Sequence, residues 1–103
     1  MTRYQHITIE DNGRLLAEAR VRTTRQMVHA ALRVEPGQLP PGTRTRLVDA
    51  LLDLSTAEPG TRMHVTMPSG DVEILGRMRE RCTSTMSWAR GTKDHLEATT
   101  PQR

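Results

Sequence analysis

"YQHITIEDNGRLLAEARVR", residues 4–22, decides how this chain folds. Two runs of alternating apolar and polar residues flank Asp11-Asn12-Gly13, which is the pattern of a β-hairpin closed by a tight turn. The length of the turn decides which side chains share a face, because a slip of one residue turns every side chain of a strand over. A three-residue turn that ends on Gly13 brings Ile7 opposite Ala17, and the aliphatic groups then line one face.

The alternative turn consists of Asn12-Gly13 alone. It would place Ile7 opposite Glu18 and would mix apolar and charged side chains on both faces of the hairpin. The three-residue turn instead sets Glu10 against Arg14 on the polar face, and opposite charges across a strand pair stabilise it slightly. We therefore predict the three-residue turn.

A third strand, "MVHAALRVE" at 27–35, follows a four-residue loop. This loop places Val21 opposite Val28 and Leu15 opposite Val34, so the apolar face of the hairpin continues across the third strand. A three-stranded antiparallel meander is therefore the first part of the predicted fold.

The middle of the chain lies between two connectors rich in proline and glycine, at 35–42 and 55–60. Between them, "GTRTRLVDALLDL" (42–54) carries its apolar residues at the spacing of one side of a helix. After the second connector, "RMHVTM" (62–67) alternates apolar and polar residues and is predicted to be a strand.

The stretch "GDVEILGRMRERC", residues 70–82, fits either a returning strand or a helix. We predict a helix, because apolar residues recur at helical intervals and Ser69 or Asp71 can act as the N-cap. Its acids and arginines balance and suit the helix dipole, which argues against a phosphate-binding helix. "TSTMSWAR" (83–90) is predicted to be the last strand, and the polar chain from Gly91 onward is expected to fray in part.

These elements define a single α+β domain with the order β-β-β-α-β-α-β, a largely antiparallel sheet and two helices on one face. The predicted domain covers residues 1–98, and residues 99–103 form a flexible polar tail. A chain of 103 residues has no room for a second domain. With no Phe, one Trp and one Tyr, the core depends on aliphatic residues and Met, and such a thin core favours a dimer.

Charge and cysteine content narrow the classes of function. The net charge of +3 is a mild excess for a chain of this length and does not by itself indicate nucleic-acid binding. Cys82 is the single cysteine, so it permits no internal disulfide and fits a reducing compartment. The longest apolar runs are far shorter than a membrane span needs, so we expect a cytoplasmic protein that does not enter a membrane.

The sequence offers no recognisable chemical site. The four histidines include no close pair of the kind that metal sites use, and Cys82 lies in an apolar series typical of a small buried side chain. No phosphate loop, dinucleotide fingerprint or ordered nucleophile and base is present. We therefore predict no catalytic residue, no cofactor and no metal, and a protein that is not an enzyme.

The remaining candidate is the outer face of the meander, together with the loop of its second hairpin. Its predicted partner-binding or nucleic-acid-binding residues are Tyr4, His6, Arg20, Arg22, Arg25, His29 and Arg33. We expect a small non-catalytic cytoplasmic protein that acts through protein contacts, as a homodimer, with an unknown protein partner. The alternative is a nucleic-acid-binding regulator that uses this basic sheet face or hairpin.

Overall fold

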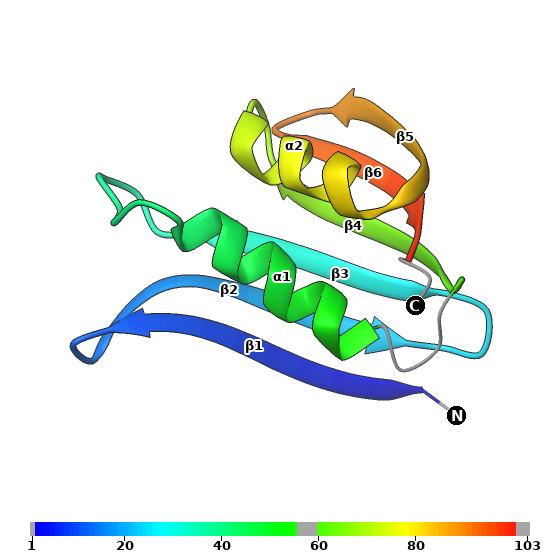
Figure 1. The fold of residues 1–103 in the computed structure, drawn as a ribbon, viewed down its shortest axis with the longest axis horizontal. Coiled ribbons are helices and arrows are strands. Elements are labelled where there is room, and N and C mark those ends of the chain that lie inside the picture. The colour runs from blue at the N-terminus through cyan, green and yellow to red at the C-terminus, as the bar shows by residue number, and fades with distance from the viewer. Residues whose placement is uncertain (1, 56–59, 101–103) are drawn as a thin grey trace.

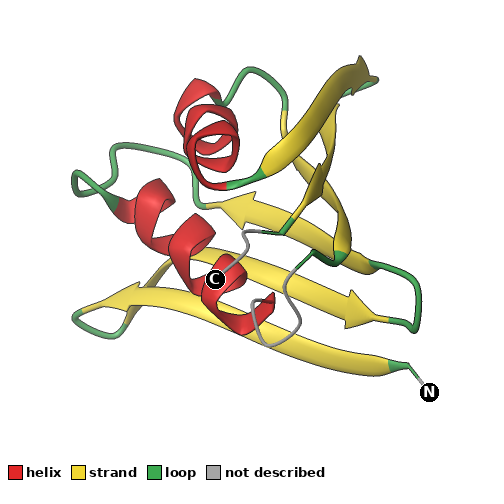
Figure 2. Ribbon diagram, turned by 45° about the vertical axis from the view of Figure 1, so that its right-hand side comes forward, coloured by secondary structure: helices red, strands yellow, loops and turns green. Residues whose placement is uncertain are grey.

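The computed structural model describes residues 2–55 and 60–100 of the chain. These residues form one mixed six-stranded sheet and two α-helices (Figure 1). In chain order the elements are β1 (Arg3–Asp11), β2 (Arg14–Thr23), β3 (Val28–Val34), α1 (Thr43–Ser55), β4 (Arg62–Pro68), α2 (Val72–Arg81), β5 (Thr83–Arg90) and β6 (Lys93–Thr99). Both helices cover the same face of the sheet, as Figure 2 shows from a second direction, and the predicted α+β class is confirmed.

The first hairpin differs from the prediction in its turn. The turn has two residues, Asn12-Gly13, with φ angles of 50° and 77°, as a type I′ turn requires. A register shift after Ile9 marks a β-bulge that adds one residue to β2, so Ile7 lies opposite Ala19 and not opposite Ala17. The predicted three-residue turn is wrong, but the bulge turns β2 over once more and keeps Ile7, Ile9, Ala17 and Ala19 on one face.

The second hairpin is also displaced by two residues from the predicted register. Val21 lies opposite Ala30, where we expected Val28. A shift of two residues leaves the paired side chains from Ala17 onward on their predicted faces, because the side-chain period of a strand is two. Leu15 is the exception, because it lies beyond the bulge and opposite Glu10, and Leu16 is buried in its place. The apolar face of the meander is therefore the buried face, as predicted.

The core lies between this face and the two helices. The fully buried helical side chains include Leu47, Leu51, Ile74 and Met78, and Cys82 joins the same cluster. The predicted helix after residue 70 is confirmed, with the carboxylate of Asp71 accepting a hydrogen bond from the backbone N–H of Ile74 at its start.

Ion pairs join the outer sides of the two helices. Asp49 of α1 accepts hydrogen bonds from Arg77 at 2.9 and 3.1 Å and from Arg81 at 3.1 Å, both of α2. The hydrogen bond from Arg77 is the main reason that the pKa of Asp49 lies below its usual value, with Arg81 adding to the effect and burial opposing it. The arginines near the end of α2 are therefore structural, in agreement with the sequence analysis.

The chain from Gly91 onward was predicted to fray in part, and this prediction is wrong for residues 93–99. It forms β6, which lies between β4 and β5, so β5 is at the edge of the sheet and is not the last strand. Leu96 and Ala98 of β6 are buried, and the backbone N–H of Thr100 donates to the carbonyl of Thr61 at 2.9 Å. Of the predicted tail at 99–103, the last three residues lie outside the described part of the chain.

Within residues 2–55 and 60–100, no helix is both long and apolar enough to cross a membrane.

Candidate functional site

Two parallel strands at the centre of the sheet move apart along their length. The β3–β4 pairing ends at Ala31 and Thr66, although β3 continues to Val34 and β4 to Pro68. Figure 1 shows the two strands diverging toward the ends near which α1 and α2 begin. We call residues 31–34 of β3 and 66–68 of β4 the strand divergence. Open sheets with parallel strands characteristically bind ligands beyond the carboxyl ends of such strands.

A connector, residues 35–42, leads from the strand divergence into α1. Gly42 has a φ of 85°, a left-handed conformation that glycine adopts without strain, and α1 follows at once. The hydroxyl of Thr43 donates to the carbonyl of Pro40 at 2.7 Å and holds the preceding loop against the helix. The first backbone N–H groups of a helix carry partial positive charge and suit an anionic group.

The starts of the two helices are tied together. The Nε of Arg44 donates to Oδ2 of Asp71 at 2.7 Å, while Oδ1 of Asp71 accepts the hydrogen bond that caps α2. The Asp71 side chain is only 8% exposed, so this ion pair is largely shielded from water. One carboxylate therefore fixes the distance between the two helix starts beside the strand divergence.

A cluster of aromatic rings lies on the open face, which is the side of the sheet away from the two helices. The Nε2 of His64 is 3.1 Å from the Nδ1 of His95, and the rings of both lie nearly parallel to the indole of Trp88 at centroid distances of 5.9 and 5.5 Å. His29 meets His64 edge to face at 5.8 Å. Three strands that are far apart in sequence thus bring their imidazoles together.

The electrostatics of this cluster favour a neutral His64. Burial is the largest cause that lowers the pKa of His64, and the nearby His95 and His29 lower it further, against the raising effect of Glu97. Among the described residues, no group of three His, Cys, Asp or Glu side chains is arranged to hold a metal ion. The lowered pKa keeps His64 in its neutral form at neutral pH, and a neutral imidazole has a lone pair that can accept a proton.

Sequence reasoning did not find this cluster. His64 and His95 are separated by 31 positions, so no spacing rule connects them. They meet because β6, which was not predicted, pairs with β4. The alternation of the strand after residue 61 was the only local signal, since it placed His64 on the polar face.

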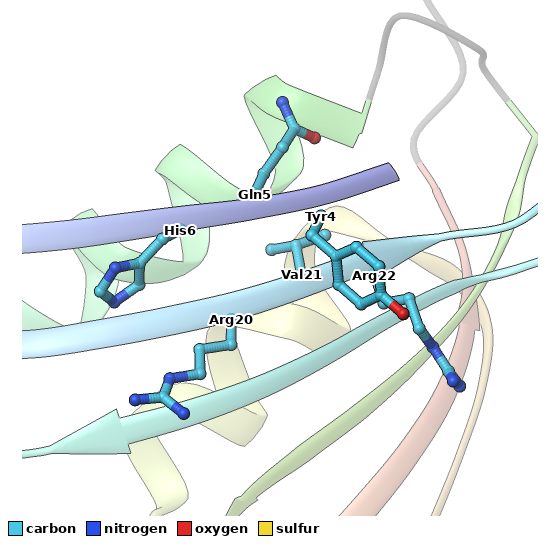
Figure 3. A pocket seen from close by; sticks show the side chains of 6 residues that line it. All are labelled: Tyr4, Gln5, His6, Arg20, Val21 and Arg22. Carbon is cyan, nitrogen blue, oxygen red and sulfur yellow. The ribbon is translucent and has the colours of Figure 1, made fainter. Parts of the chain in front are cut away.

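The predicted partner surface is partly assembled on the same open face. Tyr4, His6, Arg20 and Arg22 line a hollow of about 550 Å³ on β1 and β2, which Figure 3 shows together with Gln5 and Val21. Among the other members, His29 lies opposite Arg22 on β3, Arg33 is exposed farther along the same strand, and Arg25 is exposed in the loop between β2 and β3.

Negative charge is present within this predicted surface. Glu18 lies 3.4 Å from His6 and 3.5 Å from Arg20, so it offsets part of the positive charge there. A binding role for this surface stays a prediction.

Neither the family models nor the curated proteins include a match to this sequence. Solved structures do match. Several solved acetyltransferases share this fold. The ribosomal-protein-S18-alanine N-acetyltransferase of Escherichia coli superposes with a TM-score of 0.68 at 13% identity, over 98% of this chain and 72% of that one.

Two further acetyltransferase structures are also similar to this chain. An N-acetyltransferase from Staphylococcus aureus gives a TM-score of 0.63 at 12% identity, over 93% of this chain and 66% of that one. A GNAT superfamily phosphinothricin acetyltransferase from Sinorhizobium meliloti, in complex with AcCoA, gives 0.61 at 14% identity, over 95% of this chain and 62% of that one. This chain thus spans about two thirds of the length of the enzymes it resembles.

These structures overturn the functional prediction made from the sequence. We expected a non-catalytic protein that is not an enzyme, with nucleic-acid binding as the alternative, and the fold is instead one that acetyltransferases use. The prediction failed because it relied on sequence motifs. At 12–14% identity the likeness lies in the course of the backbone, which a motif search does not detect.

Proposed function

We propose that this chain binds an acyl-CoA thioester, with acetyl-CoA as the simplest example, at the strand divergence and transfers the acyl group to an amine. The observation that carries the proposal is the parallel pair that stops pairing at Ala31 and Thr66, with two helices starting beside it, in a fold shared with acetyltransferases. An acyl-CoA supplies an activated carbonyl carbon and a thiolate leaving group.

The backbone of β3 fits the amide-containing arm of coenzyme A. Beyond Ala31, β3 stays paired with β2 on one side, and its other edge is no longer paired with β4. Backbone groups at a strand edge bind extended amides in the way that another strand would. A ligand arm that lies along this edge would bring its thioester next to Thr66.

The start of α1 fits the phosphates only in part. Gly42 and the first turn of α1 offer backbone N–H groups, and Arg44 and Arg46 add positive charge. Pro40 and Pro41 carry no N–H, so the loop before Gly42 contributes fewer donors than its length suggests. Asp71 engages the Nε of Arg44, which leaves the terminal nitrogens of that guanidinium as the donors for a phosphate.

Calorimetric titration with acetyl-CoA tests the binding. We expect a dissociation constant below about 1 mM, the upper end of common substrate affinities. Arg44→Gln should weaken the affinity, and Arg3→Gln, the same change on the distant edge strand β1, should not. The release of free thiol in the presence of primary amines would then report transfer. If the chain binds no acetyl-CoA at millimolar concentration, the proposal is wrong.

Two expectations from the sequence remain separate proposals. Self-association into a homodimer is supported by β1 and β5, which end the sheet and leave one edge of each strand available for pairing. Sedimentation over a range of protein concentrations tests it, and a monomer at every concentration would refute it. A cytoplasmic location is supported by the buried free thiol of Cys82 and is tested by fractionating the host cell.

A further inference from the structure

We propose that the hydrogen-bonded imidazole pair of His64 and His95 is the general base that deprotonates the acceptor amine. This assignment rests on the proposed acyl transfer and adds the group that prepares the nucleophile. An amine attacks a thioester only through its lone pair, so an ammonium substrate must first lose a proton.

The position of the pair places it beside the reacting bond. Thr66 is the last residue of β4 that pairs with β3, and it marks the point where the strand divergence begins. His64 precedes Thr66 by two residues on the same face of β4, a distance of about 7 Å along a strand. His95 lies directly opposite Thr66 on β6. The two imidazoles therefore flank this residue on the open face, from which an acceptor can approach.

The hydrogen bond between the rings ensures that the pair can accept a proton. In the neutral pair one hydrogen lies between Nε2 of His64 and Nδ1 of His95, which are 3.1 Å apart. Each neutral imidazole carries one hydrogen, so one of the two outer nitrogens carries the second hydrogen and the other has a free lone pair. This holds for either tautomer. One added proton then converts the bond into a charge-assisted hydrogen bond that both rings share.

The surroundings keep His64 neutral before the pair acts. The titratable and charged positions on the neighbouring strands of this face are His29 and Arg33 of β3, Arg62 of β4, Arg90 of β5, and Lys93 and Glu97 of β6. Glu97 is engaged by Arg62 at 3.1 Å, so the one nearby acid is largely neutralised. Burial and the neighbouring imidazoles lower the pKa of His64, which leaves it unprotonated at neutral pH.

The substrate nitrogen loses two protons during the transfer. The ammonium group gives one proton to the free imidazole nitrogen and becomes a neutral amine. The amine nitrogen forms a bond to the thioester carbon, the carbon–sulfur bond breaks, and the thiolate of coenzyme A leaves. The nitrogen loses its second proton to the thiolate, and the imidazolium releases the first proton to solvent, so one proton is released per turnover. No oxidant or metal takes part.

The test compares His64→Gln, His95→Gln and the double variant with the wild-type chain. Glutamine keeps a hydrogen-bonding group at each position but cannot take up a proton at neutral pH. The probes are acetyl-CoA with an alanine-starting hexapeptide, and acetyl-CoA with a lysine-containing peptide whose N-terminus is blocked. Thiol release is followed from pH 5 to 9, and acetyl-CoA affinity and urea unfolding are measured on the same samples.

We expect each single variant to lose about 100-fold or more in rate, the usual contribution of a general base. The double variant should lose no more than the worse single variant, because the two rings act as one unit. The wild-type rate should rise with pH through the titration of the pair, and this limb should vanish in the variants. Arg3→Gln should match the wild type. Added imidazole should partly restore the rate of His64→Ala.

The outcomes separate this assignment from the proposed function. If the wild type binds no acetyl-CoA, both proposals fail. If it binds and transfers, and the variants keep the same rate and pH profile, the base assignment alone is wrong. Binding without thiol release by the wild type also overturns the base assignment. If the rate falls only in proportion to lost affinity or lost folding, and the rise of the rate with pH remains, the two histidines have a structural role. The base assignment is then wrong as well.

Discussion

Removal of the Asp71 carboxylate should destabilise the fold through two separable effects. Asp71 caps α2 and pairs with Arg44 at 2.7 Å. Loss of an N-cap costs about 1 kcal/mol. A charge-assisted hydrogen bond contributes about 1.5–3 kcal/mol when it is shielded, and the 32% exposure of Arg44 reduces this to about 1 kcal/mol. Asp71→Ala should therefore lower the free energy of unfolding by about 2 kcal/mol, and Asp71→Asn, which keeps a capping oxygen, by about 1 kcal/mol.

Urea unfolding followed by circular dichroism measures both variants. For a domain of this size, about 2 kcal/mol corresponds to a fall in Tm of about 8–16 °C. Asp53→Ala is the control, since its ion pair with Arg81 spans 3.7 Å with a 75% exposed carboxylate and should contribute less than about 0.5 kcal/mol. Equal losses for Asp71→Ala and Asp71→Asn would refute the capping contribution. A loss below about 0.5 kcal/mol for both would refute the whole argument.

Two substitutions and one labelling experiment test the core and the ion pairs further. Leu51→Ala, at a fully buried position of α1, should lower the free energy of unfolding by about 2–5 kcal/mol in the same urea assay, and a smaller loss would show a poorly packed core. The hydrogen bond from Arg77 keeps the pKa of Asp49 in the folded chain below its usual value of 3.8. The stability that ionised Asp49 contributes is therefore complete above pH 3.8 and is lost as the pH falls through the lower pKa of the folded chain. Asp49→Asn should therefore flatten the fall of stability with pH below pH 3.8, and an unchanged fall would contradict this. Burial raises the pKa of the Cys82 thiol, so a thiol reagent at pH 8 should label it slowly in the folded chain and rapidly in urea, and fast labelling of the folded chain would contradict its burial.

The first hairpin shows what the alternation of apolar and polar residues determines and what it does not. Alternation assigned Ile7 and Ala19 to the buried face, because burial requires one face of the sheet to be apolar. It did not assign their pairing. The turn Asn12-Gly13 and the bulge after Ile9 each shift the register by one residue, and the two shifts cancel in the pattern of faces. A bulge leaves no signature in the alternation of a single strand.

The sequence did not predict the last strand, β6, for a related reason. Residues 93–99 contain only two buried side chains, Leu96 and Ala98, among polar ones. Such a segment has little tendency to form a strand by itself. It is ordered because β4 and β5 satisfy its backbone on both sides, and those partners come from other parts of the sequence.

The candidate site depends on contacts of this kind. The sequence alone determined the helices, the apolar face and the position of His6, His29 and His64 on the polar side of their strands, since these follow from periodicity and from burial of apolar groups. Only the tertiary structure decided that β3 and β4 run in parallel and then diverge, and that β6 brings His95 to His64. The physical reason is that strand pairing is made by backbone hydrogen bonds, which are the same for every residue except proline. Partner choice is therefore settled by the packing of the whole chain.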